Sequence, residues 1–344
     1  MFSGLPVKTS LHKRKREHLD IALTGDVSSG SISKGFDAYR FVHQALPEID
    51  LSSVDTSTQL FGRVLKAPLL ISPMVGGIEE AATINRNLAM AAQNLGLGMG
   101  VGSQRCALDD SGSVSSYTVR DVAPDILLFA NLGAVQLNHG YTVEHCRRAV
   151  DMIGADALML HLNPLQEALQ SEGNTDFAGL LKRIEAVCRR LEVPVIVKEI
   201  GFGISSEVAS RLVAAGVRGI DVAGAGGTSF SRIETTREHG QEAEDAFSSW
   251  GIPTAESIKM VRTASPDITL IASGGVRTGV EVAKSIALGA DAAGIGAPLL
   301  KPASISHSEV VDCIKGIIKD LRISMFCAGV GSIGRLKNCT LSQG

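Results

Sequence analysis

This sequence of 344 residues has few aromatic side chains, few charged ones and no long apolar run. Aromatic residues make up 4% of the chain, so we expect Ala, Val, Ile, Leu and Gly to fill the interior. No segment approaches the roughly 18 consecutive apolar residues of a membrane-spanning helix, and the first 30 residues lack a signal-peptide core. We therefore expect no membrane partner. Charged residues make up 20%, below the usual quarter or so, which predicts that part of the surface is buried in a homo-oligomer.

The net charge and the cysteine pattern argue against a nucleic-acid partner and a zinc site. The formal net charge is −3, and the one basic cluster, HKRKR at residues 12–16, has no second basic stripe to support it. The six cysteines are scattered without CxxC pairs. This spacing does not fit a disulfide framework, and it favours a reducing, cytoplasmic location.

Eight short apolar runs recur along the chain, and most are followed by a stretch long enough for a helix. They span residues 67–74, 96–103, 125–133, 157–163, 193–201, 217–224, 269–275 and 292–298. This alternation predicts an α/β fold, a (β/α)₈ TIM barrel. Barrels of this kind place their chemistry at the C-terminal ends of the strands, so those ends hold the candidate site residues.

The chain divides into three predicted parts. Residues 1–66 form an N-terminal extension with a basic helix that ends near Leu23, and residues 67–303 hold the eight barrel units. Residues 304–344 form a C-terminal helix and tail. The helix is predicted because apolar side chains recur every three or four positions over residues 308–328.

Three glycine-rich segments follow the sixth, seventh and eighth runs. They are residues 224–230, with the Thr228 hydroxyl, residues 273–279, with the Arg277 cation, and residues 294–298. Backbone N–H groups beside a helix N-terminus bind anions, and barrels commonly bind phosphate after their last two strands. We expect a phosphorylated ligand here. The alternative is that these glycines only permit tight turns.

Lys198 ends the fifth run and can point into the barrel mouth. A buried lysine is costly unless it meets an anion or forms a Schiff base. Three interpretations stay open from the residues alone: a lysine paired with a carboxylate such as Glu199, aldolase chemistry, or positive charge beside an anionic reduced flavin.

The segment after the fourth run, residues 161–173, is unusually rich in polar groups. It contains His161, Asn163, Gln166, Glu167, Gln170 and Glu172. Glu167 is the best candidate for a Mg²⁺ ligand, because this cation prefers carboxylate oxygen and shares substrate phosphates. The competing interpretation is an ordinary glutamate at a helix N-terminus.

The second and third runs end in further polar groups. Ser103, Gln104 and Arg105 are suited to phosphate. Cys106 has no histidine nearby in the sequence, so we do not expect it to be a nucleophile. Asn131 ends the third run as either a ligand-binding amide or a structural one.

In this order, the motifs resemble those of the type 2 isopentenyl-diphosphate isomerases, which depend on FMN. The most specific are RKREHL at residues 14–19, GSQR at 102–105 and HLNPLQE at 161–167, and the resemblance covers nearly the whole chain. It implies interconversion of isopentenyl diphosphate and dimethylallyl diphosphate by a 1,3-allylic proton shift. It also implies reduced FMN as acid and base, NADPH as its reductant, Mg²⁺, and a homo-tetramer or homo-octamer.

The resemblance also implies roles for matching residues. Gln166 and His161 lie at the reacting centre, and Glu167 binds the metal. The substrate is held by Arg14, Lys15, His18, Ser103, Gln104, Arg105, His161, Asn163 and Gln166. FMN is held by Ser72, Pro73, Met74, Ser103, Asn131, Lys198, Thr228, Gly274, Gly275, Arg277, Ala297 and Pro298. The resemblance thus implies that the basic cluster at residues 12–16 holds the substrate diphosphate.

Two positions depart from the family pattern. Val75 stands where the family usually has threonine, which removes a hydroxyl expected near FMN. Asn174 stands where aspartate is common, which removes one negative charge near the pocket.

The sequence leaves two other function classes open. Another FMN-dependent barrel, such as a 2-hydroxy-acid oxidase or an enzyme like inosine-monophosphate dehydrogenase, is the first alternative. The oxidase needs a histidine after the seventh strand, where SGGVRTG has none, and the dehydrogenase needs a cysteine after the sixth, where GAGGTSFSRIE has none. The second alternative is a flavin-binding or nucleic-acid-binding module without turnover.

Overall fold

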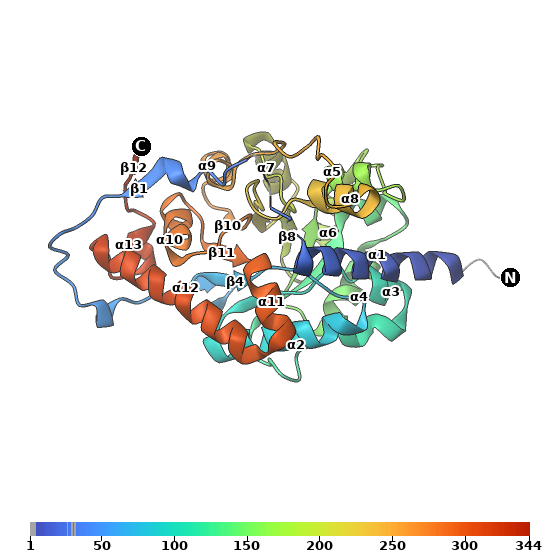
Figure 1. Cartoon of the computed structure of the whole chain (residues 1–344), viewed down its shortest axis with the longest axis horizontal. Coiled ribbons are helices and arrows are strands. Elements are labelled where there is room, and N and C mark those ends of the chain that lie inside the picture. The colour runs from blue at the N-terminus through green and yellow to red at the C-terminus, as the bar shows by residue number, and fades with distance from the viewer. Residues whose placement is uncertain (1–4, 26, 29, 31) are drawn as a thin grey trace.

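The computed structural model describes residues 5–25, 27–28, 30 and 32–344, and it is built around a closed barrel (Figure 1). Its eight parallel strands confirm the sequence prediction, since each falls within one of the eight apolar runs. They are β4 (Leu69–Ile71), β5 (Gly98–Gly100), β6 (Leu127–Gly133), β7 (Ala157–His161), β8 (Val195–Lys198), β9 (Gly219–Asp221), β10 (Thr269–Ala272) and β11 (Ala292–Ile295). β11 pairs with β4, which closes the barrel.

Helices surround the barrel because each carries one apolar face toward the strands. They are α2 (Glu79–Leu95), α3 (Arg105–Asp109), α4 (Val143–Ile153), α5 (Pro164–Leu169), α6 (Leu180–Arg190), α7 (Ser206–Ala214), α8 (Phe230–His239), α9 (Thr254–Ala264), α10 (Gly279–Ala287) and α11 (Ala297–Ile305). None of the helices that the structure describes is long and apolar enough to cross a membrane.

The core has two layers. One lies inside the barrel and includes Leu70, Phe129 and Ile196, whose neighbours along each strand point outward instead. The other lies between the strands and the helices. A hairpin of β2 (Thr58–Leu60) and β3 (Arg63–Leu65) adds to the inner layer, where Phe61 meets Phe129 edge to face.

The terminal segments pack on the outside of the barrel, and both contact α11. α1 (Leu5–Thr24) lies near α8 and α11, and the long α12 (His307–Cys327) packs on α2, α10 and α11 (Figure 1). β1 (Tyr39–Phe41) pairs with β12 (Leu341–Gln343). The remaining short helices are η1 (Phe36–Ala38), η2 (Leu51–Ser53), η3 (Ser111–Ser116), η4 (Ala134–Asn138) and α13 (Ile333–Leu336).

An arginine clamp joins β6 to β7 at the N-terminal end of the barrel. Arg120 donates from Nε to the Gly154 carbonyl at 2.9 Å and from Nη2 to Asp156 Oδ2 at 2.7 Å. The same carboxylate oxygen accepts the Leu128 N–H at 2.9 Å. Arg63 binds the other oxygen at 2.7 Å. Because most donors and acceptors are paired, the clamp fixes the start of both strands.

A second clamp of the same design joins β10 to β11. Arg262 donates from Nε to the Gly289 carbonyl at 2.8 Å and from Nη2 to Asp291 Oδ2 at 3.0 Å. That oxygen accepts the Leu270 N–H at 2.7 Å, and Lys337 binds the other one. The two clamps lie four strands apart, so the two halves of the barrel are fastened in the same way.

Candidate active site

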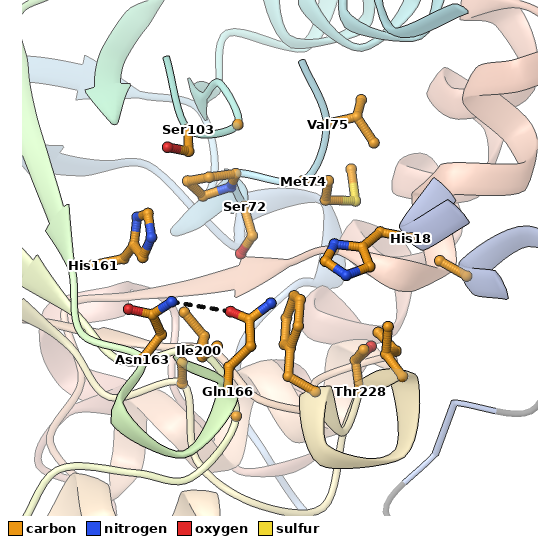
Figure 2. Close-up of a pocket in the computed structure, with 18 of the residues that line it drawn as sticks. His18, Ser72, Met74, Val75, Ser103, His161, Asn163, Gln166, Ile200 and Thr228 are labelled. Atoms are coloured by element: carbon orange, nitrogen blue, oxygen red, sulfur yellow. Dashed lines mark hydrogen bonds between the residues drawn. The ribbon is translucent and has the colours of Figure 1, made fainter. Parts of the chain in front are cut away.

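A cavity of about 310 Å³ opens at the C-terminal end of the barrel, lined by the segments that follow all eight strands (Figure 2). Every predicted FMN residue lines it: Ser72, Pro73, Met74, Ser103, Asn131, Lys198, Thr228, Gly274, Gly275, Arg277, Ala297 and Pro298. So do all but one of the predicted substrate residues, namely Arg14, Lys15, His18, Ser103, Arg105, His161, Asn163 and Gln166, together with Glu167.

Gln104 is the exception, and the prediction that it faces the substrate is wrong. Its side chain is fully buried, donates to the Ala149 carbonyl at 2.8 Å and accepts the Asn131 N–H at 2.9 Å. Gln104 lies in the turn that leads into α3, with φ −83° and ψ 9°, and its side chain points away from the cavity. Ser103 and Arg105 line the cavity, while Gln104 fastens β5 to β6 and α4.

One face of α1 covers the cavity. The residues that line it recur every three or four positions, which places them on one side of a helix. They are Leu11, Arg14, Lys15, His18, Leu19 and Ala22. The basic cluster is therefore part of a helical cover that combines cations with apolar side chains.

Lys15 lines the cavity and is fastened to the barrel beside it. Its ammonium donates to the carbonyls of Gly76 at 2.8 Å and Ser103 at 2.9 Å, and to the Tyr117 hydroxyl at 2.8 Å. An ammonium has three N–H donors, and these contacts use all three. Burial lowers the pKa of Lys15 to about 8, although the neighbouring Cys106 raises it. A substrate oxygen would have to replace one of these contacts, and the substrate role of Lys15 stays a prediction.

Arg14 and His18 contact side chains that can move. Arg14 donates to Gln170 Oε1 at 2.7 Å and lies 3.7 Å from a Glu172 oxygen. Burial lowers the pKa of Arg14, while nearby carboxylates, Glu167 first, raise it. His18 Nε2 lies 3.0 Å from Glu234 Oε1. A bound diphosphate can replace these partners without breaking the backbone of the barrel.

His161 is held as a neutral base at the end of β7. Its Nδ1 lies 2.8 Å from Asn131 Oδ1, which fixes the ring. Burial lowers the pKa of His161 to about 4, and the charges of Lys198 and Lys15 lower it as well. Because the Asn131 oxygen only accepts, Nδ1 carries the hydrogen of the uncharged ring, which leaves Nε2 as an acceptor that adds no positive charge to the site.

The predicted polar loop after β7 contains a short helix, α5, which brings its polar groups together. Asn163 donates from Nδ2 to Gln166 Oε1 at 3.1 Å and to Glu167 Oε1 at 2.9 Å (Figure 2). The other Glu167 oxygen accepts the backbone N–H of Asn174 at 2.6 Å. Because the contact from Asn174 uses its backbone, the departure from aspartate there leaves the contact intact.

Glu234 is a site residue that sequence reasoning missed. It is buried on α8, accepts from Gln166 Nε2 at 2.9 Å and from Arg237 Nη1 at 2.9 Å, and faces His18. Burial raises the pKa of Glu234, but His18, Gln166 and Arg237 together bring it below its ordinary value. One feature of the sequence could have indicated Glu234. It follows Phe230 by four positions, so both side chains fall on the same helix face, the one that meets α1 and α5.

Lys198 is paired inside the barrel mouth, but with a different carboxylate from the one proposed. Its Nζ lies 3.7 Å from Asp221 Oδ2 and 3.4 Å from Ser273 Oγ, and it donates to the backbone carbonyl of Glu199 at 2.8 Å. The Glu199 carboxylate instead accepts the N–H groups of residues 200–202. Burial raises the pKa of Glu199 to about 7, although those hydrogen bonds lower it.

The residues present fit FMN. The Ser72 hydroxyl is buried without a hydrogen-bond partner among the described residues, so it is available to a ligand. A Cβ on Gly227 would meet the Gly275 backbone, so these two glycine loops touch and leave only backbone beside the cavity. Both α10 and α11 begin at this rim, where their N–H groups attract a phosphate.

The residues also fit a weakly held hard cation. Glu167 is the carboxylate nearest the polar groups of α5, and the Asn163 Oδ1 beside it has no partner in the part of the chain that the structure describes. The described residues hold no group of three or more His, Cys, Asp or Glu that could bind a metal alone. A Mg²⁺ ion here would therefore need substrate phosphate oxygens and water to complete its shell.

Known proteins resemble this chain over nearly its full length. The model of the FMN-dependent dehydrogenase family matches residues 7–162 and 166–343. An isopentenyl-diphosphate delta-isomerase from Stutzerimonas stutzeri (strain A1501) is 52% identical over 340 residues, 98% of each chain. One from Synechococcus sp. is 51% identical over 336 residues, 97% of each chain. Among solved structures, a mandelate oxidase variant with a monooxide FMN adduct has 23% identity and a TM-score of 0.67, covering 97% of this chain and 100% of that chain. That likeness shows the fold alone.

Proposed function

We propose that this chain interconverts isopentenyl diphosphate and dimethylallyl diphosphate. The chain belongs to the FMN-dependent dehydrogenase family and to the isopentenyl-diphosphate delta-isomerases within it. The observation that carries the proposal is that the two sides of one cavity carry different chemical groups. Cations and the Glu167 carboxylate line the cavity under α1 and α5, opposite glycine loops and helix N-termini suited to a flavin phosphate. Together these features accommodate a substrate diphosphate beside FMN.

Reduced FMN supplies the proton donor and acceptor for the 1,3-allylic shift, and NADPH keeps it reduced. The protein's own groups orient the alkene and exclude water. Gln166 cannot titrate, and its side chain is fixed between Asn163 and Glu234 at the reacting centre. The neutral His161 contributes a hydrogen bond without competing as a strong acid. Leu11, Leu19 and Phe230 provide apolar surface for the isopentenyl group.

The diphosphate is held on the α1 side of the cavity. Arg14 and His18 approach it from α1, with Ser103, Arg105 and Asn163 from the barrel. Glu167 would hold Mg²⁺, which would supply positive charge to the substrate diphosphate. Arginine suits this task because its planar fork makes paired hydrogen bonds to phosphate.

The FMN residues lie along the rest of the rim. Ser72, Pro73, Met74, Asn131 and Thr228 or their backbones would hold the ring system, and the loops with Gly274, Gly275, Arg277, Ala297 and Pro298 would hold the phosphate. Lys198 would supply positive charge to the reduced ring. Val75 lines the same wall and offers no hydroxyl, so Ser72 is the side-chain hydroxyl left on this loop.

The test is an anaerobic assay of protein with FMN, NADPH and Mg²⁺, with product measured by chromatography. Conversion that requires both reduced flavin and Mg²⁺ supports the proposal. Bound flavin, shown by its absorbance, without any conversion contradicts it. Bleaching of the flavin by 2-hydroxy acids would support an oxidase instead.

We further propose a cytoplasmic homo-tetramer or homo-octamer. Large apolar side chains are exposed at Leu46 (78%), Val64 (75%) and Trp250 (60%), and burial between subunits would remove them from water. All six cysteines are free thiols, as expected in a reducing compartment. Sedimentation velocity would distinguish the two assemblies from a monomer.

A further inference from the structure

Lys34, in the segment between α1 and β1, touches two of the glycine loops at the barrel rim. A Cβ on Gly226, after β9, would lie 2.6 Å from the Cα of Lys34, and one on Gly275, after β10, would lie 2.7 Å from its Cδ. Both glycines have positive φ, +106° and +78°. Gly275 lines the cavity and Lys34 does not, so Lys34 lies against the outer side of this loop.

The backbone around Lys34 is held by contacts that do not use its side chain. The Lys34 carbonyl accepts the N–H of Ala255, on α9, at 3.0 Å. The Phe36 carbonyl accepts from Nζ of Lys284, on α10, at 3.0 Å, and the Phe36 side chain is buried. The segment is therefore fastened to both helices whatever the side chain at position 34, which leaves the Lys34 ammonium free for another task.

The Lys34 ammonium forms an ion pair with Glu281, in the first turn of α10. Glu281 is part of a capping box, in which its N–H donates to the Thr278 hydroxyl at 3.2 Å. Its Oε2 accepts the backbone N–H groups of Arg277 at 2.8 Å and Thr278 at 3.3 Å. The carboxylate is thereby fixed on the loop that is proposed to hold the flavin phosphate.

A carboxylate on this loop opposes the binding of a phosphate. A phosphate monoester carries a charge of about −2 near neutral pH, so it is repelled by an unbalanced Glu281. The side chains of Lys34 and Glu281 are only 23% and 17% exposed, and water and salt screen partly buried charges less than exposed ones. The cation of Lys34 balances the carboxylate, and the Arg277 side chain, which lines the cavity, remains available to the phosphate.

We propose that Lys34 is a positioning residue for the flavin phosphate and that it acts through Glu281. From the outer side of the loops it neutralises the carboxylate, so α10 keeps its cap and its first turn still accepts a phosphate. Lys34 itself does not touch the flavin. This role rests on the FMN part of the proposed function alone and is independent of the isomerase reaction.

The experiment compares FMN with riboflavin, which has the same ring system and no phosphate. Each is titrated into flavin-free, full-length protein, and binding is read from flavin fluorescence. In Lys34→Met, which keeps most of the aliphatic stem, we expect the FMN dissociation constant to rise about tenfold, or ~1.4 kcal/mol. The riboflavin constant should stay unchanged. Equal weakening of both flavins would show that Lys34 only maintains the shape of the loops, and it would overturn the proposal.

A second substitution tests whether Lys34 acts through Glu281. Glu281→Gln removes the charge and keeps an oxygen that accepts the backbone N–H groups of the loop. Alone, this variant should bind FMN at least as tightly as the parent protein. Combined with Lys34→Met, it should restore FMN binding to within about twofold of the parent value, because no unbalanced carboxylate remains. A double variant that binds FMN as weakly as Lys34→Met contradicts the proposal.

Lys301→Met is the matched control for the loss of one positive charge. Lys301 is an exposed residue of α11, the other helix that begins at this rim, so its variant should bind FMN within about twofold of the parent protein. Weakening as large as that in Lys34→Met would show an effect of net charge alone and overturn the proposal. None of these readouts depends on turnover, so a failure of the proposed isomerase activity would leave them informative.

Discussion

The two halves of the barrel, β4–β7 and β8–β11, are alike at the N-terminal ends of their strands and different at the C-terminal ends. At the N-terminal end, Arg120 with Asp156 fastens β6 to β7, as Arg262 with Asp291 fastens β10 to β11. At the C-terminal end the halves carry different groups. β7 ends in His161, with Glu167 just beyond it, whereas β11 is followed by glycine, alanine and proline.

This difference shows how a barrel separates stability from chemistry. The N-terminal end has only to hold strands together, so the same arginine–aspartate clamp occurs in both halves. The C-terminal end meets the ligands, and the two halves carry different sets of groups there. The first half carries the proposed diphosphate and metal groups together with flavin residues such as Ser72, and the second carries only proposed flavin groups. Changes at the metal group and at the phosphate loops of the flavin should therefore give effects that do not overlap.

The largest expected effect is on the metal side of the first half. Glu167→Gln removes the charge that binds Mg²⁺, so we expect kcat/KM to fall about a thousandfold, equivalent to ~4 kcal/mol. FMN affinity, measured by flavin absorbance, should stay unchanged because Glu167 is remote from the glycine loops. Glu172→Gln is a nearby control with a smaller effect. Equal loss of FMN binding in Glu167→Gln would remove the distinction between the halves.

The two clamps should contribute similar stability. Asp156→Ala and Asp291→Ala each leave a largely buried arginine without its partner, so we expect each to lower the free energy of unfolding by about 2–3 kcal/mol. Because the clamps share no residues, the double variant should show the sum. Urea unfolding measures both. A large loss from only one of them would show that the halves are fastened unequally.

The phosphate side of the second half should respond in FMN affinity alone. Arg277→Ala removes a charged hydrogen-bond donor, so we expect the FMN dissociation constant to rise about tenfold or more, from the loss of ~1.5–3 kcal/mol. The concentration of Mg²⁺ that gives half-maximal activity at saturating FMN should not move. A shift in that concentration would count against separate sites.

The smallest expected effect is a pH dependence that belongs to the first half. The pKa of His161 is about 4 in the folded protein, against 6.5 when unfolded. The unfolded chain therefore binds a proton first as pH falls below 6.5, and folding should weaken by about 1 kcal/mol at about pH 5.5. His161→Asn should remove this loss. The matching position beyond β11 is Gly296, which cannot titrate.

The barrel could be predicted from the sequence because its signals are local. Each strand lies in a short apolar run that ends near a glycine or a polar residue, and the runs alone locate all eight barrel strands. The rim residues followed from the rule that strand ends carry the site. The prediction for Gln104 was wrong because the direction of its side chain depends on the turn that leads from β5 into α3, and the sequence does not specify the geometry of that turn.

What could not be predicted depends on residues far apart in the chain. Lys15 and Tyr117 are separated by 102 positions, and neither resembles half of a pair in the sequence. Glu234 lies 68 positions from Gln166, on a helix whose rotation about the rim is set by tertiary packing. In both cases the partner is fixed by how helices pack over the barrel mouth, which periodicity does not encode.

The paired clamps have a consequence for dividing the molecule. A cut in residues 191–194, between α6 and β8, leaves Arg120 with Asp156 on one fragment and Arg262 with Asp291 on the other. The fragments would rejoin through two strand pairings, β7 with β8 and β11 with β4. Ser72 and Arg277 would then lie on separate pieces, so neither piece alone carries the whole flavin cradle. Flavin capture would thus serve as a signal for fragment complementation.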